Sequence, residues 1–137
     1  YFKDIKNALI ISANNLYLFS KQMAQNNTII NYHNSLLPKH RGLNAHIWAI
    51  WENDEFSGIS WHLVDSGIDT GKILVQKQIK LDKRATAREL LLAQHKLAIS
   101  SFDEALLKLK NKEFITQLDR GGVALFIKAQ SCQIMLF

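Results

Sequence analysis

Three side chains of the types needed for one reaction, Asn31, His33 and Asp69, lie at or just beyond the ends of two predicted strands. Asn31 and His33 are two residues apart on one strand, and side chains with that spacing leave the same face. Asp69 follows a later strand, within the turn-forming run 65–71. In an open parallel sheet, ligands bind beyond the carboxyl ends of the strands, so the carboxylate can return to the same centre. An amide, an imidazole and a carboxylate together suit the transfer of an acyl group to an amine.

The chemistry of such a transfer explains why these three groups are needed. When an amine attacks an acyl carbon, the carbon becomes tetrahedral and its oxygen becomes an oxyanion. A carboxamide N–H such as that of Asn31 and a protonated imidazole such as that of His33 stabilise this oxygen, and one such donor is typically worth about 2.7–4 kcal/mol. The amine must also lose a proton and the departing nitrogen must gain one, which a carboxylate beside a histidine can mediate. The expected reaction requires neither a metal ion nor a covalent intermediate.

The elements expected around these residues form one α/β domain. A strand, a helix and a second strand follow one another within the first part of the chain, and that order indicates a crossover between parallel strands. Thr86 and Glu89 have the spacing of a capping box at the start of a long amphipathic helix, and Asn44 is a suitable N-cap for a shorter one. The expected strands are 8–12, 28–33, 58–64, 72–80 and 123–127, and the expected helices are about 14–25, 45–52 and 86–110.

The composition also favours a single domain. The chain has 137 residues, of which 47% are hydrophobic, and this is enough for one ordinary core. Its lone cysteine, Cys132, cannot form an internal disulfide, so we expect a reducing, cytoplasmic location. The formal charge of +5 suits a phosphate-bearing or RNA partner, or simply a solvated lysine surface. Trp48, Trp51 and Trp61 are expected in the core.

The two loops that carry these residues resemble motifs of the formyltransferase family, which uses 10-formyltetrahydrofolate. The family's Asn-x-His at a strand end matches Asn31 and His33, its Ser-Leu-Leu-Pro loop matches residues 35–38, and its Asp-Thr-Gly matches residues 69–71. Members include the glycinamide ribonucleotide, methionyl-tRNA and amino-sugar formyltransferases and the formylation domains of peptide synthetases. The segment 41–62 looks most like the amino-sugar and peptide-synthetase types, and the resemblance extends from about residue 8 to residue 110.

This resemblance implies a Rossmann-like α/β domain with a mostly parallel sheet over residues 1–137, with an unassigned tail from residue 114. Because family members carry further βα units before the Asn-x-His motif, it also implies that the first of these are lacking here. The co-substrate would be 10-formyltetrahydrofolate, without a metal. The acceptor would be a small-molecule or carrier-bound amine, with tRNA left open and no membrane partner. The implied residues are catalytic Asn31, His33 and Asp69; folate-binding Ser35, Leu36, Leu37, Pro38, Asp65, Thr70 and Gly71; and substrate-binding Arg41 and Asn44.

Other interpretations of the same residues lead to different functions. A hydrolase could use the same pocket with water attacking the formyl-folate, and a non-catalytic relative could bind folate as a module. Ser35 with a histidine and an aspartate suggests covalent hydrolysis, but the Gly-x-Ser-x-Gly turn that exposes such a nucleophile is missing around it. His40, His46 and His62 match no zinc-ligand spacing, so no metal site is expected.

Overall fold

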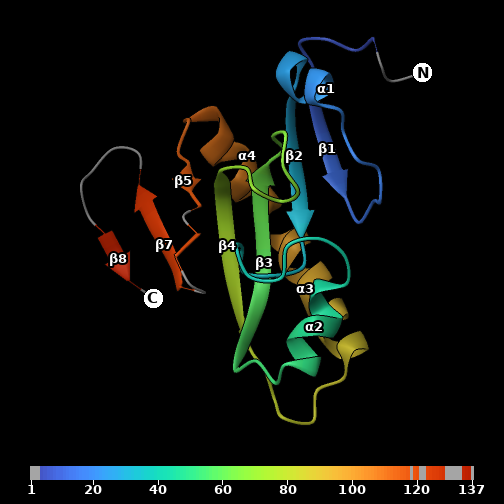
Figure 1. Ribbon diagram of the computed structural model, residues 1–137, viewed down its shortest axis with the longest axis vertical. Helices are drawn as coiled ribbons and strands as arrows, with labels where there is room; N and C mark the ends of the chain where they lie inside the picture. Colours follow the sequence, from blue (N-terminus) through green and yellow to red (C-terminus); the bar gives the residue numbers. More distant parts are fainter. Residues whose placement is uncertain (1–3, 118, 121–122, 129–133, 137) are drawn as a thin grey trace.

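The strands form one sheet, in which β2 lies close to one end of the strand order (Figure 1). The computed structural model describes residues 4–117, 119–120, 123–128 and 134–136. The strand order is β1-β2-β3-β4-β5-β7-β6, and β8 pairs with β7. The five expected strands are all present, with ends that shift by at most two residues. The bounds are β1 Leu9–Ala13, β2 Thr28–His33, β3 Phe56–Leu63, β4 Ile73–Lys80, β5 Ile115–Thr116, β6 Asp119–Arg120, β7 Val123–Lys128 and β8 Ile134–Leu136.

The α/β class is confirmed, but the sheet is mixed rather than mostly parallel. β1 and β2 are parallel and are joined through α1 (Lys21–Asn26), whereas the other described strand pairs are antiparallel. β3 and β4 follow one another through the loop 64–72, and antiparallel neighbours need no crossover. Because β3 runs against β2, its carboxyl end lies beside Ile30 rather than beside His33. The loop 64–72 therefore folds back over the sheet to reach the end of β2.

Helices α3 (Ala87–Ser100) and α4 (Phe102–Lys110) lie together behind the sheet in Figure 1 and close the core. Trp61 of β3 donates its indole N–H to the carbonyl of Ala98 at 3.2 Å, and its ring packs on Phe102 with centroids 5.3 Å apart. Alternate residues of β2 and β3 point away from these helices, so the opposite face is left for polar side chains. The buried cluster is Ile30, Tyr32, Ile59, Trp61, Leu74, Val75, Ala98 and Ala105.

The long helix expected over residues 86–110 is interrupted at Ser101. Its predicted capping box is confirmed, since Thr86 and Glu89 each accept a hydrogen bond from the backbone N–H of the other. The Ser101 hydroxyl donates to the carbonyl of Leu97 at 2.7 Å, and the Ser101 backbone N–H donates to the same carbonyl. A serine that bonds to the preceding turn in this way bends a helix. The chain therefore continues as two helices, α3 and α4.

Helix α1 starts later than the sequence indicates. The asparagine pair 14–15 forms a turn instead of capping a helix, because the Asn15 side chain accepts a hydrogen bond from the N–H of Tyr17. The helix begins only after Ser20, whose hydroxyl accepts from the N–H of Met23 at 3.2 Å. Met23 is buried, so the short helix still packs its apolar side against the rest of the domain.

Helix α2 (Ala45–Trp51) begins after Asn44, as expected, but buries a different side. Asn44 has a left-handed φ of 61°. Its backbone carbonyl, rather than its side chain, accepts hydrogen bonds from the first turn of the helix. The helix turns its alanines inward, whereas Trp48 and Trp51 are 50% and 77% exposed. The prediction that all three tryptophans lie in the core is therefore correct only for Trp61, which is 4% exposed.

Within the described part of the chain, none of the helices has the length and apolar character needed to cross a membrane. Cys132 lies outside the described residues.

Candidate active site

Asn31, His33 and Asp69 meet on the face of the sheet opposite α3 and α4. Nδ1 of His33 lies 3.4 Å from one carboxylate oxygen of Asp69. Nε2 of His62 lies 3.4 Å from the other oxygen, and Asn31 Nδ2 lies 3.2 Å from the same nitrogen of His62. The carboxylate thus sits between two imidazoles, and the amide joins the group through the second of them. The structure brings together the three residues expected to act together and adds a fourth.

The fourth residue, His62, was considered from the sequence only as a rejected metal ligand. It is the register partner of Asn31 across the β2–β3 pair and is 1% exposed. Its Nδ1 donates to the carbonyl of Leu63 at 2.8 Å, so Nε2 is the nitrogen that meets Asn31 and Asp69. The alternation of β3 indicates only that His62 points away from Trp61. The place of His62 beside Asn31 depends on the register of β3 against β2, which cannot be predicted from the sequence.

Asp69 is held as a carboxylate by its neighbours. Burial alone would raise its pKa, but the contact with the His62 imidazole, the nearby His33 imidazole and the N–H of Gly42 together lower the pKa of Asp69 to about 2. The Gly42 N–H donates to Asp69 at 2.8 Å. This bond ties the loop after β2 to the loop after β3, and it leaves Asp69 ionised over the whole neutral range.

His33 is held in one orientation by the backbone. Its Nε2–H donates to the carbonyl of His40 at 2.8 Å, which directs Nδ1 toward Asp69. Burial lowers the pKa of His33, against the opposing effect of the Asp69 charge and of the bond to His40. The neutral ring therefore carries its proton on Nε2 and its lone pair on Nδ1. Such a ring can accept a proton at Nδ1, beside a carboxylate that stabilises the charged product.

The loop 35–38 is held by buried hydrogen bonds. The Ser60 hydroxyl donates to the carbonyl of Ser35 at 2.7 Å and accepts from the N–H of Leu37 at 3.1 Å. Gln76 donates to the carbonyl of Leu37 at 2.9 Å. The side chain of Leu37 is fully buried, whereas Leu36 and Pro38 are half-buried. Leu37 therefore anchors the loop, whereas its two flanking residues keep part of their surface accessible.

The loop 65–71 is braced both internally and from the C-terminal part of the chain. One oxygen of Asp65 accepts from the N–H of Gly67 at 3.0 Å and from the Thr70 hydroxyl at 2.6 Å. Gln117 donates to the carbonyls of Asp69 and Gly71 at 3.0 and 2.7 Å.

Arg41 and Asn44, the two expected substrate contacts, occupy different surroundings. Arg41 is half-buried and donates to Gln117 at 2.9 Å, so it joins the brace of the 65–71 loop. Asn44 is exposed at the start of α2. Gln117 lies in the tail from residue 114, to which no role was assigned from the sequence. A lone glutamine gives no sequence signal that it will brace the 65–71 loop.

Comparison with known proteins decides the family. The formyl transferase family matches residues 2–106. The chain belongs to this family. The resemblance seen in the Asn-x-His, Ser-Leu-Leu-Pro and Asp-Thr-Gly motifs is thereby confirmed.

Relatives within the formyl transferase family include enzymes named for different acceptors. The chain is 39% identical over 80 residues to GDP-perosamine N-formyltransferase of Brucella melitensis biotype 1, covering 58% of this chain and 31% of that protein. It is 44% identical over 61 residues to methionyl-tRNA formyltransferase of Lachnospira eligens, covering 44% and 19%. The N-formyltransferase of Helicobacter canadensis, solved with folinic acid and dTDP-3-aminofucose, has a TM-score of 0.74 and 25% identity, covering 82% and 42%. The chain therefore spans less than half the length of these relatives.

The protonation of His33 gives a first prediction about this family member. Its NMR titration should lie below the ordinary value of about 6.5, and Asp69→Asn should lower it further, because the carboxylate is what favours the imidazolium. The measurement is the pH dependence of the His33 Cε1–H signal. His46, whose pKa is lowered by burial and by His95, serves as the internal reference and should not respond to Asp69→Asn. A His33 titration that rises in the variant would contradict this account.

The close approach of the backbone at Gly71 gives a second prediction. A Cβ built there lies 1.7 Å from the carbonyl oxygen of Leu63, a backbone atom that cannot turn aside. We expect Gly71→Ala to destabilise the protein by about 1–3 kcal/mol or more, as overpacked sites do, in urea unfolding. Gly67→Ala is the comparison, because its Cβ would meet the Thr70 hydroxyl, a side-chain atom that can turn aside at the cost of its bond to Asp65. Equal losses in the two variants would show that the backbone contact is unimportant.

Proposed function

We propose that the protein transfers a formyl group from 10-formyltetrahydrofolate to an amine, with Asn31, His33 and Asp69 as the catalytic group. The observation that carries the proposal is the Asp69 carboxylate, which lies 3.4 Å from both His33 and His62 and is joined through His62 to Asn31. Membership of the formyl transferase family supports the reaction class. The folinic acid bound by the Helicobacter canadensis relative supports a reduced folate as the co-substrate.

In the proposed reaction, the amine nitrogen attacks the formyl carbon and the carbonyl electron pair moves to oxygen. Asn31 carries two amide hydrogens, of which one meets His62 and the second is available to the oxyanion. The attacking nitrogen passes a proton to Nδ1 of His33, whose new charge is stabilised by Asp69. When the intermediate collapses, the bond between the formyl carbon and the folate nitrogen breaks. That nitrogen takes the proton from His33, and the formyl amide is released.

Two loops provide the proposed folate site. Leu36 and Pro38 would contact the ligand, from a loop whose buried residues Ser35 and Leu37 are held by Ser60 and Gln76. Asp65, Thr70 and Gly71 shape the other loop, and its backbone would contact the pterin. Both loops are fixed before any ligand arrives, which lowers the entropy cost of binding.

The acceptor proposed first is an amino-sugar nucleotide, because two of the relatives act on or bind such compounds by name. Methionyl-tRNA is the second candidate, from the name of another relative. The half-buried Arg41 is the residue proposed to meet acceptor phosphate, because its planar guanidinium matches phosphate geometry. The net charge of +5 suits either acceptor.

The function is tested by supplying the protein with 10-formyltetrahydrofolate and, separately, an amino-sugar nucleotide, methionyl-tRNA, glycinamide ribonucleotide or no amine. We expect tetrahydrofolate to appear only when an amine is present, together with an equal amount of formylated product. Formate release without an amine would show that the protein is a formyl-folate hydrolase and not a transferase. Folate binding without turnover on any acceptor would leave a binding module.

A further inference from the structure

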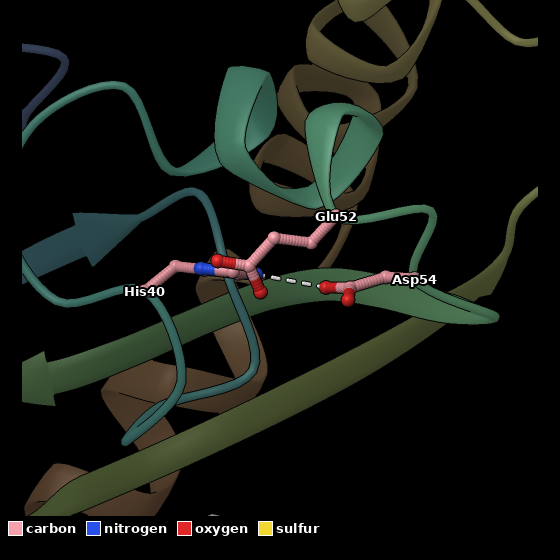
Figure 2. Close-up of side chains that lie close together, drawn as sticks. All are labelled: His40, Glu52 and Asp54. Atoms are coloured by element: carbon pink, nitrogen blue, oxygen red, sulfur yellow. Dashed lines mark hydrogen bonds and ion pairs between the residues drawn. The ribbon is translucent and has the colours of Figure 1, made fainter.

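A buried hydrogen-bonded pair, His40 and Asp54, lies next to His33, outside the proposed catalytic group. Nε2 of His40, in the loop after β2, lies 2.8 Å from a carboxylate oxygen of Asp54, in the turn before β3. Their side chains are only 9% and 6% exposed. The ammonium group of Lys39 lies against the other oxygen of Asp54. Figure 2 shows His40 and Asp54 pointing toward one another, with Glu52 approaching from the end of α2.

The same residue, His40, touches both this pair and the catalytic group. Its imidazole meets Asp54, while its backbone carbonyl accepts the Nε2–H of His33 at 2.8 Å. His40 has a φ of 53°, in the left-handed region that residues with a Cβ rarely adopt. A strained backbone of this kind persists where the surroundings fix it. The buried bond between the His40 imidazole and Asp54 holds the His40 backbone in this conformation, and it thereby sets the direction of the His40 carbonyl.

We propose that Asp54 and His40 form a positioning pair for His33, an inference that rests on the proposed function. Asp54 anchors the imidazole of His40, and the anchored loop presents its carbonyl to Nε2 of His33. That bond selects the tautomer with the proton on Nε2 and turns Nδ1 toward Asp69 and the reacting centre. Asp54 itself does not meet the substrate. It acts on the reaction only through His40.

The same residues offer the donor set of a divalent cation, but their contacts favour the positioning role. Ligand atoms of His40, Glu52 and Asp54 lie within 4.8 Å of one another. However, Asp54 is already bonded to His40 and to the ammonium group of Lys39. Glu52 is 49% exposed and lies 3.8 Å from His40. A cation would have to displace bonds that are already made, whereas the positioning pair uses them as they are.

The test compares Asp54→Ala and His40→Asn with Glu52→Ala. Asparagine tolerates the left-handed region, so His40→Asn removes the anchor without imposing new backbone strain. Glu52→Ala removes a carboxylate from the same cluster but leaves the bond from His40 to Asp54. Nitrogen NMR of the His33 ring reports which nitrogen carries the proton, and circular dichroism confirms that each variant is folded. Steady-state kinetics with 10-formyltetrahydrofolate give kcat and KM.

We expect the native protein and Glu52→Ala to hold the His33 proton on Nε2, while both other variants populate the two tautomers. In those variants kcat should fall about tenfold to a hundredfold, as misplacement of a catalytic group does, with KM for the folate within about threefold. The variant carrying both changes should lose no more than the worse single variant, because the two residues act along one path.

The inference is overturned if either folded variant keeps the native tautomer of His33, or if the losses from the two variants add. It is also overturned if zinc titrated into the native protein shifts the His40 ring signals and raises activity, since the cluster would then be a metal site. A tautomer change without formyl transfer in the native protein would refute the proposed function and leave the positioning contact established. The two failures are therefore distinguishable.

Discussion

Replacing Asp69 with asparagine is expected to slow formyl transfer by about a hundredfold or more, the usual loss when an acid–base group is removed. The carboxylate lies 3.4 Å from both His33 and His62 and is ionised, with a pKa of about 2. An asparagine keeps the shape but cannot stabilise an imidazolium at His33. Folate affinity should change by less than about tenfold, because the proposed pterin contacts come from the backbone of the loop.

The measurement for Asp69→Asn is the initial rate of formyl transfer together with folate affinity from equilibrium binding. Asp103→Asn is the matched control, because Asp103 is exposed on α4 and the same chemical change should leave both quantities unaltered. A variant that keeps more than about a tenth of the native rate would remove Asp69 from the mechanism. A parallel collapse of folate binding would show instead that the loop had been lost.

Replacing Asn31 with alanine is expected to lower kcat by about a hundredfold to a thousandfold, the loss measured when one oxyanion donor is removed. The contact with His62 at 3.2 Å fixes the orientation of the Asn31 amide. Its second N–H is therefore already directed to the proposed oxyanion position before the reaction begins. An interaction made only in the transition state lowers kcat and kcat/KM together. The kinetic pattern, and not only the size of the loss, therefore tests the assignment.

The control for Asn31→Ala is Asn111→Ala, an exposed asparagine at the end of α4, which should retain the native kinetics. If Asn31→Ala raised KM and left kcat unchanged, Asn31 would contact the ground-state substrate rather than the oxyanion. If it abolished folding, His62 would be shown to depend on this amide, and Asn31→Gln would be needed to separate the two roles.

Much of the domain is determined by features that lie close together in the chain. The capping box of Thr86 and Glu89 and the strand ending at His33 depend on a few neighbouring residues, and the structure contains both where they were expected. The two loop motifs are likewise continuous in sequence, which is why the family and three of the four residues in the central group could be predicted. The interruption of the long helix at Ser101 was not predicted, because a serine hydroxyl can either cap a helix or bend one. Only its hydrogen bond to the Leu97 carbonyl, seen in the structure, distinguishes the two.

Strand register and direction were decided only by the tertiary structure. β3 runs against β2, so Asp69 reaches the site over the face of the sheet, and His62 stands beside Asn31 because those residues are register partners. Gln117, from the tail, braces the Asp69 loop across 48 positions of sequence. The bond from His40 to Asp54 likewise depends on a left-handed backbone at a residue with no sequence signal for it. The sequence by itself determined which chemical groups this protein carries; long-range packing, which no local pattern encodes, decided which of them meet.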